Sequence, residues 1–177
     1  MKTYFEDFDF TDFWDDCDES EESYISDYPD DAIIAKVQGK LGYKLPESYI
    51  EFMKIHNGGL VKRNCFPIDY IPTIGTDFVD FYGFLGIGSA KICSLLGDVG
   101  SAFWIDHWHY PNIGIAICDT PSAGHDLIFL DYSKVGAEGE PEVVHICEEN
   151  DFKVTFLAKD FETFIKSLKY EGDFADK

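Results

Sequence analysis

The side chains best suited to do chemistry are histidines and aspartates that gather in one short stretch of the chain. His107 and His109 form a His-x-His pair, which on a β-strand would place both imidazoles on one face and offer two ligands to a metal ion. Asp119, His125 or Asp126 would supply a third ligand from the turn that follows. The alternative is that these polar groups form hydrogen bonds within a turn. The spacing is therefore compatible with a metal site but does not require one.

Pairs of a nucleophile and a base can be drawn in the same stretch. Cys118 with His125, or Ser122 with His125 and Asp126, has the residue types of a nucleophilic site. Neither combination lies in a recognised context such as the nucleophile elbow. Cys118 also ends an apolar run, which is typical of a small buried residue. We therefore expect a protein without enzymatic activity, cofactor or bound metal.

The elements that must position these residues are two apolar runs and the turn between them. Residues 113–118 and 127–132 are almost continuously apolar, and turn-forming residues separate them at 120–124. This pattern predicts a β-hairpin. Since few polar positions interrupt either run, both faces are expected to be covered, so the hairpin is predicted to lie at the centre of a sheet.

Hydrophobic spacing predicts the remaining elements. A helix is predicted from Pro29, with Asp30 or Asp31 as its cap and Gly42 at its end, and a second helix spans residues 45–59. The other predicted elements are strands near 60–67 and 81–87, one or two helical turns at 91–96, a hairpin at 142–147 and 152–157, and a closing helix at 161–168. This order predicts an α+β fold with a single largely antiparallel sheet and helices packed against it.

The chain is strongly acidic. It has 14 lysine and arginine residues against 34 aspartate and glutamate residues, which gives a formal charge of −20. Such a surface repels nucleic acid and anionic membranes, so we expect neither as a partner. It favours a basic protein or a cationic substrate, and a role in solubility alone is the alternative.

The sequence also predicts a cytoplasmic location. The first residues are acidic rather than basic and then apolar, and no apolar run approaches the roughly 18 residues of a spanning helix. The five cysteines are an odd number and form no CxxC pair, which favours free thiols.

The N-terminal segment differs from the rest of the chain. Residues 1–31 contain thirteen acids against Lys2, a net charge of −12 out of −20. Aromatic residues are interleaved with the acids, and such a segment is expected to dock. Either Phe5, Phe8 and Phe13 lie back on the domain's own surface, or the segment is a disordered arm that meets a partner.

The helix at residues 45–59, LPESYIEFMKIHNGG, resembles the signature helix of the SUKH superfamily, with its Leu-Pro-acid start and Asn-Gly-Gly stop. Later pieces agree in order, and the resemblance covers about residues 30–170. These pieces are FLGIGS, the Gly97-Asp98 pair, a tryptophan-rich stretch, IGIAICDTPSAGHDLIFLDYS, GEPEVVHI and LAKDFETFI. The resemblance divides the chain into an acidic segment at 1–29, a SUKH-like domain at 30–170 and a tail at 171–177.

The resemblance implies an α+β domain that acts by binding rather than by catalysis. Bacterial members serve as immunity proteins that neutralise a toxin, often a nuclease, whereas fungal members resemble regulators of cell-wall synthesis. We expect an immunity protein with a basic toxin as its partner. The alternative is an intracellular scaffold or regulatory protein of the same family, whose acidic aromatic tail recruits a partner.

Acids near predicted loops and the aromatic stretch before the hairpin are the predicted contact points. Trp104 is expected to be buried, and Trp108 or Tyr110 to be at least partly accessible as an interface anchor. The predicted partner-binding residues are Asp77, Asp80, Asp98, Asp106, Trp108, His109, Tyr110, Asp119 and Asp126.

Overall fold

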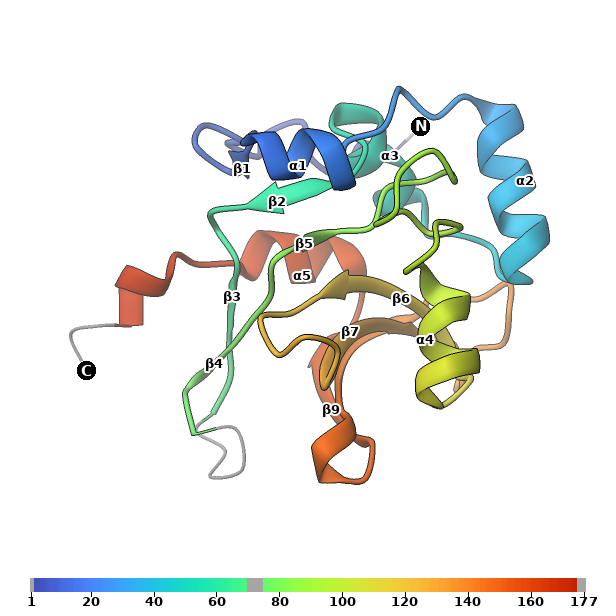
Figure 1. The fold of residues 1–177 in the computed structure, drawn as a ribbon. Helices are drawn as coiled ribbons and strands as arrows, with labels where there is room; N and C mark the ends of the chain where they lie inside the picture. The colour runs from blue at the N-terminus through green and yellow to red at the C-terminus, as the bar shows by residue number, and fades with distance from the viewer. Residues whose placement is uncertain (1, 70–74, 175–177) are drawn as a thin grey trace.

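A computed structural model describes residues 2–69 and 75–174 (Figure 1). A seven-stranded antiparallel sheet has the strand order β1-β2-β5-β6-β7-β8-β9. Its strands are β1 (Trp14–Asp15), β2 (Gly59–Val61), β5 (Gly83–Phe84), β6 (Gly114–Asp119), β7 (Asp126–Asp131), β8 (Glu142–Cys147) and β9 (Lys153–Ala158). The predicted α+β class with one largely antiparallel sheet is confirmed.

Helices and a small second sheet complete the fold. The α-helices are α1 (Asp18–Ser23), α2 (Asp31–Leu41), α3 (Glu47–Ile55), α4 (Ser101–Trp108) and α5 (Phe161–Ser167). Two 3-10 helices are η1 (Glu148–Asn150) and η2 (Glu171–Phe174), and β3 (Cys65–Pro67) pairs with β4 (Phe78–Asp80). None of the helices in the described residues has both the length and the apolar character of a membrane span. Each of the five cysteines is free.

The predicted central hairpin is confirmed. Strand β6 is fourth in the order of seven, and β7 pairs with it through Ile115 opposite Leu130 and Ala116 opposite Phe129. All four of these side chains are buried. At the start of β6, a Cβ on Gly114 would lie 1.8 Å from the Leu130 carbonyl oxygen, so the close pairing requires glycine there.

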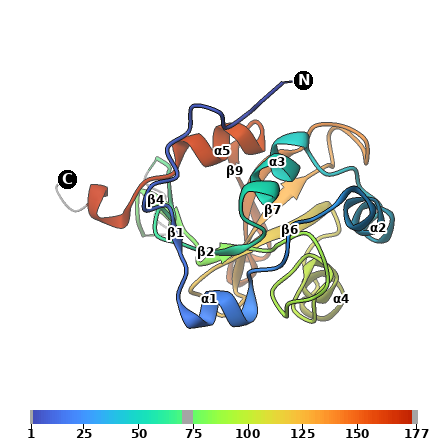
Figure 2. The same ribbon diagram turned by 90° about the horizontal axis from the view of Figure 1, so that it is seen from above.

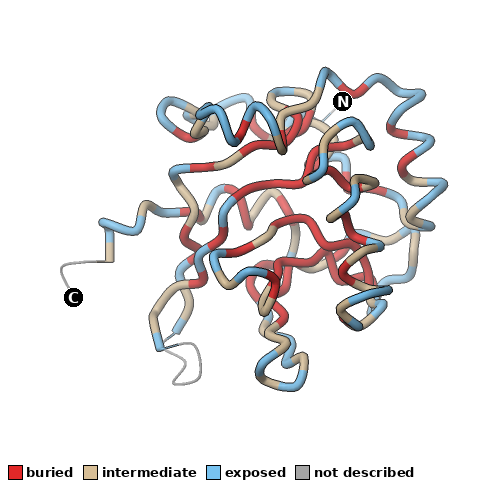
Figure 3. Tube along the Cα trace, in the orientation of Figure 1, coloured by how far each residue is buried: buried red, intermediate tan, exposed pale blue. Residues whose placement is uncertain are grey.

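The two faces of the hairpin belong to two cores. Ile115 and Leu130 lie in the larger core with Phe52 of α3 and residues of α5. Ala116 and Phe129 lie in a smaller core on the other face, which α4 covers. Figure 2 shows α3 and α5 on one side of the sheet and α4 on the other, and Figure 3 shows the buried positions concentrated along the central strands. This two-sided burial explains why the strands are apolar at almost every position.

The first two predicted helices are confirmed, together with their ends. The Asp30 carboxylate caps α2 by accepting a hydrogen bond from the Ile33 amide at 2.8 Å. Gly42 ends α2 with φ of +77°, the left-handed conformation that glycine adopts without strain. Helix α3 begins directly after Pro46. The hairpin of β8 and β9 and the closing helix α5 are also confirmed.

One prediction is confirmed only in part, and two are wrong. The strands expected near 60–67 and 81–87 are broken into short pieces, with β2 and β3 in the first and β5 in the second, and residues 91–96 form turns rather than a helix. The stretch before the hairpin is helix α4, so His107 and His109 do not share a strand face. His109 instead ends that helix in the left-handed conformation, with φ of +61°. Residues 175–177 of the expected tail lie outside the described residues.

Candidate protein-binding surfaces

The acidic N-terminal segment packs against the domain as part of the larger core. Phe5 and Phe13 are buried, and Phe10 and Trp14 are half-buried against the same core. All four rings surround Phe52 of α3, with centroid separations from 5.1 to 6.0 Å. Aromatic pairs at such separations stabilise beyond their buried area. The first of the two alternatives, docking on the domain's own surface, is therefore the one observed.

Hydrogen bonds fix the backbone of this segment. The Glu51 carboxylate accepts from the amides of Tyr4 and Phe5 at 3.0 and 2.9 Å. Further along, β1 pairs with β2, and the Ser20 hydroxyl of α1 accepts from the Leu60 amide at 3.0 Å. The segment thus adds an edge strand and a helix to the sheet.

Asn57, in the Asn-Gly-Gly stretch after α3, ties the end of the segment to the sheet. Its side-chain amide donates to the carbonyls of Asp27 and Ile87 at 2.7 and 3.0 Å, and its oxygen accepts from the Ile87 amide at 2.7 Å. Gly58 beside it has φ of +82°, and a Cβ there would lie 2.7 Å from the Tyr24 carbonyl oxygen. Asn57 and Gly58 therefore join the end of α3 to the N-terminal segment and to the loop that follows β5, in addition to ending the helix.

Once fixed in this way, the segment presents its charge to solvent. Of its thirteen acids, Asp15 is half-buried and the other twelve are exposed. Lysines pair with Asp12 and Asp31 in the described residues, and His56 lies 3.0 Å from Asp16. We call these twelve residues the acidic surface: Glu6, Asp7, Asp9, Asp12, Asp16, Asp18, Glu19, Glu21, Glu22, Asp27, Asp30 and Asp31.

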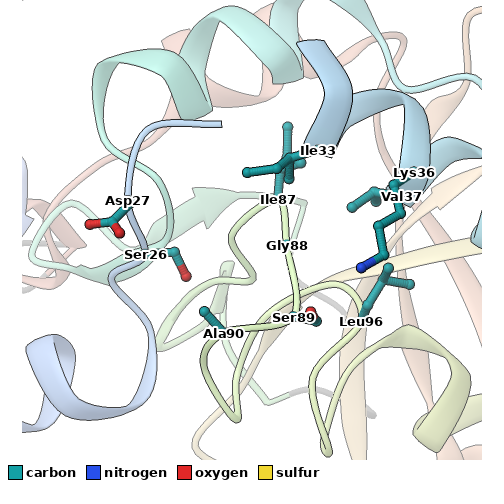
Figure 4. A pocket seen from close by; sticks show the side chains of 10 residues that line it. All are labelled: Ser26, Asp27, Ile33, Lys36, Val37, Ile87, Gly88, Ser89, Ala90 and Leu96. Carbon is teal, nitrogen blue, oxygen red and sulfur yellow. The ribbon is translucent and has the colours of Figure 1, made fainter. Parts of the chain in front are cut away.

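A cavity of about 210 Å³ opens beside the acidic surface, between α2 and the loop that follows β5 (Figure 4). Ile33 and Val37 of α2 form one apolar wall, and Ile87 and Leu96 form the other. Lys36 also lines the opening. The remaining lining residues are Ser26, Asp27, Gly88, Ser89 and Ala90. The hydroxyl oxygen of Ser26 is buried and has no hydrogen-bond partner among the described residues.

Helix α4 and the β6–β7 turn form a second surface. The Trp108 ring is half-buried, 5.6 Å from the ring of His125. His125 Nδ1 lies 3.0 Å from the Glu148 carboxylate, and this hydrogen bond raises the pKa of His125. Asp106 on the same helix and His109 directly after it are exposed. Trp104 is buried against this surface, as predicted.

Two of the predicted contact residues are held inside the molecule. The prediction that Trp108 or Tyr110 is partly accessible is confirmed by Trp108. Tyr110 is not accessible for contact: it is 2% exposed, and its hydroxyl donates to the Gly124 carbonyl at 2.7 Å. Asp119 is half-buried and accepts a hydrogen bond from the Tyr24 hydroxyl at 2.5 Å. Burial raises the pKa of Asp119 to about 6. Through the hydrogen bond from Tyr24, the Asp119 carboxylate helps to hold the N-terminal segment in place.

The remaining predicted acids are dispersed. Asp77 and Asp80 lie at β4, and exposed Asp98 lies in the loop before α4. Partial burial of its carboxylate raises the pKa of Asp80, and the charge of Asp126 adds a smaller contribution in the same direction. The densest display of acid is the N-terminal segment, which the sequence pattern had set apart from the domain.

Asp126 belongs to a hydrogen-bonded turn, with His145 as its closest side-chain partner. His145 Nε2 lies 2.6 Å from one Asp126 oxygen, and the Thr120 hydroxyl donates to the other at 2.8 Å. Burial alone would raise the pKa of Asp126, but hydrogen bonds from His145, Ser122 and Thr120 outweigh it and lower the pKa. His145 was missed because an imidazole in an apolar strand gives no local signal. Only the pairing of β8 with β7, which sets it opposite Ile128, places it near the turn.

This network has the residue types of a catalytic triad without its connectivity. The Ser122 hydroxyl contacts Thr120 at 2.7 Å and the Asp126 amide at 2.9 Å. The imidazole that reaches Asp126 belongs to His145, whereas His125 contacts Glu148. Within residues 2–69 and 75–174, no group of three potential ligands is placed to hold a metal ion. These hydrogen bonds hold the β6–β7 turn in one conformation beside α4.

A comparison with known families agrees with the fold. The model of the SMI1 / KNR4 family (SUKH-1) matches residues 28–167. No curated protein matches the chain. The match begins near the end of the acidic segment, so this segment lies outside the family model although it is part of the folded core. Because the match covers most of the 177 residues, the chain belongs to the SMI1 / KNR4 family (SUKH-1).

Proposed function

We propose that this protein is an immunity protein, which binds a basic protein toxin such as a nuclease in the cytoplasm and neutralises it by contact rather than by catalysis. The observation that carries the proposal is the acidic surface, because twelve exposed carboxylates are fixed on a folded SUKH domain. A rigid array loses little conformational entropy when a partner binds.

Charge of this density acts mainly on the rate of association. Complementary fields raise association rate constants from about 10^5–10^6 to about 10^8–10^9 per molar per second at low salt. A toxin that must be captured before it reaches its target favours such a rate. Added salt screens the field, so the rate should fall steeply as ionic strength rises.

The cavity beside α2 supplies the second component of a binding site. Tight interfaces usually place a few apolar or aromatic anchors in pockets surrounded by polar residues. Ile33, Val37, Ile87 and Leu96 provide apolar walls, and Asp27 of the acidic surface lines the same cavity. We propose that one apolar side chain of the toxin enters this cavity while its basic residues face the carboxylates.

The test is to co-express the toxin domain encoded beside this gene with and without the protein. Relief of growth arrest is expected, and continued arrest would refute the proposal for that pair. In vitro, the triple variant Glu19→Gln, Glu21→Gln, Glu22→Gln removes three charges from the acidic surface. The expected result is association slowed at least about tenfold.

A matched control separates local charge from net charge. Glu138→Gln, Glu149→Gln and Glu171→Gln together remove three exposed charges outside the acidic surface. This control should slow association far less than the triple variant at Glu19, Glu21 and Glu22. Equal slowing by both variants would show that the acidic surface has no special role.

The cavity has its own test. Val37 is buried in its wall, whereas Ile33 lies at its partly exposed edge, so the uncharged variant Ile33→Gln puts a polar group at the opening at little cost to the fold and without changing the charge of the acidic surface. Dissociation from the toxin should become faster while association changes little. An unchanged dissociation rate would exclude the cavity from the interface.

A further inference from the structure

The two edges of the large sheet differ in how well they are protected. Strand β1 at one edge has two residues, and Asp12, Asp15 and Asp16 lie in or beside it. Charged residues on a short edge strand discourage pairing with another chain. Strand β9 at the other edge has six residues and exposes two apolar side chains, Val154 at 44% and Phe156 at 55%. The β9 edge is thus the less protected one.

These two side chains continue an apolar face of the sheet. Val154 pairs with Ile146 of β8, and Phe156 pairs with Val144. Ile146 and Val144 are buried in the smaller core under α4. Because paired residues in antiparallel strands point to the same face, Val154 and Phe156 extend this face to the edge of the sheet, where they are open to solvent.

We propose that β9 pairs antiparallel with β9 of a second copy of this chain, about a two-fold axis at Thr155. In this register Val154 of each copy lies opposite Phe156 of the other, so both exposed apolar side chains are covered. The interface is self-complementary, as a two-fold dimer requires.

Neighbouring registers fit less well. Centring the axis on Phe156 would set Val154 opposite Ala158, which lies past the register shift in the pairing of β8 with β9 and is buried in the larger core. Centring it on Val154 would set Phe156 opposite Phe152, which lies outside the strand, has φ of +54° and already packs against Tyr110. The register shift and the strand bounds therefore select the register centred on Thr155.

The distribution of charge also permits this dimer in spite of the net charge of −20. The acidic segment contributes −12 and includes β1, at the edge opposite β9. Pairing through β9 keeps the two acidic segments at the outer ends of a continuous sheet and leaves both acidic surfaces accessible. The dimer is independent of the proposed function, because no toxin takes part in its formation.

Sedimentation velocity on the full chain tests the proposal. The wild type should shift from monomer to dimer as its concentration rises to about 1 mM, the range of weak association. Phe156→Lys should weaken dimerisation at least about tenfold, as expected for loss of a central anchor. Ile55→Lys is the matched control, since Ile55 is 49% exposed at the end of α3 and should leave the dimer unchanged. A wild type that stays monomeric, or equal effects of the two variants, would overturn the proposal.

Cross-linking tests the register. Thr155→Cys places two thiols at directly opposite positions across the axis, where Cβ atoms lie about 4.5–5.5 Å apart. Exposed Cys17 and also Cys147, which lies opposite Lys153 in the same chain, are first replaced by serine. Mild oxidation should then give a covalent dimer of Thr155→Cys. The same treatment of Lys153→Cys, which lies opposite Leu157, should give none. Cross-linking of both or of neither would refute this register.

Discussion

Replacing Phe13 by alanine should destabilise the whole domain, although Phe13 lies in the acidic segment outside the family match. Its side chain is 0% exposed and contacts Phe8, Phe10, Trp14 and Phe52 at centroid separations of 5.1 to 5.9 Å. Truncating a buried phenylalanine costs about 3–5 kcal/mol through lost burial and the cavity left behind. Since small domains have about 5–15 kcal/mol of stability, Phe13→Ala should remove a large part of it.

Urea unfolding followed by tryptophan fluorescence measures this loss as a change in the free energy of unfolding. Tyr28→Ala is the control, because Tyr28 lies in the same segment, is 62% exposed and has the Lys54 amine 5.9 Å from the centre of its ring. It should cost less than about 1 kcal/mol. If Phe13→Ala also cost less than about 1 kcal/mol, the segment would not belong to the cooperative core and the reasoning would be refuted.

Three further predictions concern polar groups. Asn57→Ala removes three hydrogen bonds and should cost about 2–4 kcal/mol in urea unfolding; a loss below about 1 kcal/mol would contradict the role of Asn57. The folded pKa of Asp119, about 6, lies above its ordinary value of 3.8, so its contribution to stability is greatest at low pH and falls as pH rises through 6. The unfolding free energy of the wild type relative to Asp119→Asn should therefore fall by up to about 3 kcal/mol between about pH 4 and pH 7, and a rise would refute the assignment. Thr120→Val keeps the volume but removes the hydroxyl that contacts Asp126, and should lower stability by about 1–3 kcal/mol; no change would show that the turn network is dispensable.

The packing of the segment changes how its function must be tested. Deleting residues 1–28 would distinguish a scaffold from an immunity protein if the segment were a free arm. Because Phe5 and Phe13 are buried in the larger core, the deletion would damage the fold in either case. Substitution of exposed acids separates binding from stability, since these side chains contribute little to the core.

The confirmed elements are those with a strong local pattern. Asp30 and Gly42 bound α2 because a capping carboxylate and a left-handed glycine act within one turn of the chain. The central hairpin is apolar on both faces, which only a covered strand allows. By contrast, the stretch that ends in His107 and His109 has an apolar spacing too short to separate helix from strand, and it folded as a helix against the sheet.

The sequence by itself determined the α+β class, the central hairpin, the ends of α2 and α3, the family resemblance and the acidity of the chain, because each depends on local spacing or on composition. Only the tertiary structure decided where the acidity is displayed. Phe5, Phe13 and Trp14 find their partner in Phe52, about forty residues away, and Tyr24 finds Asp119 across the sheet. Contacts between residues so far apart depend on how the whole chain packs, and they turn a charged segment into a fixed surface.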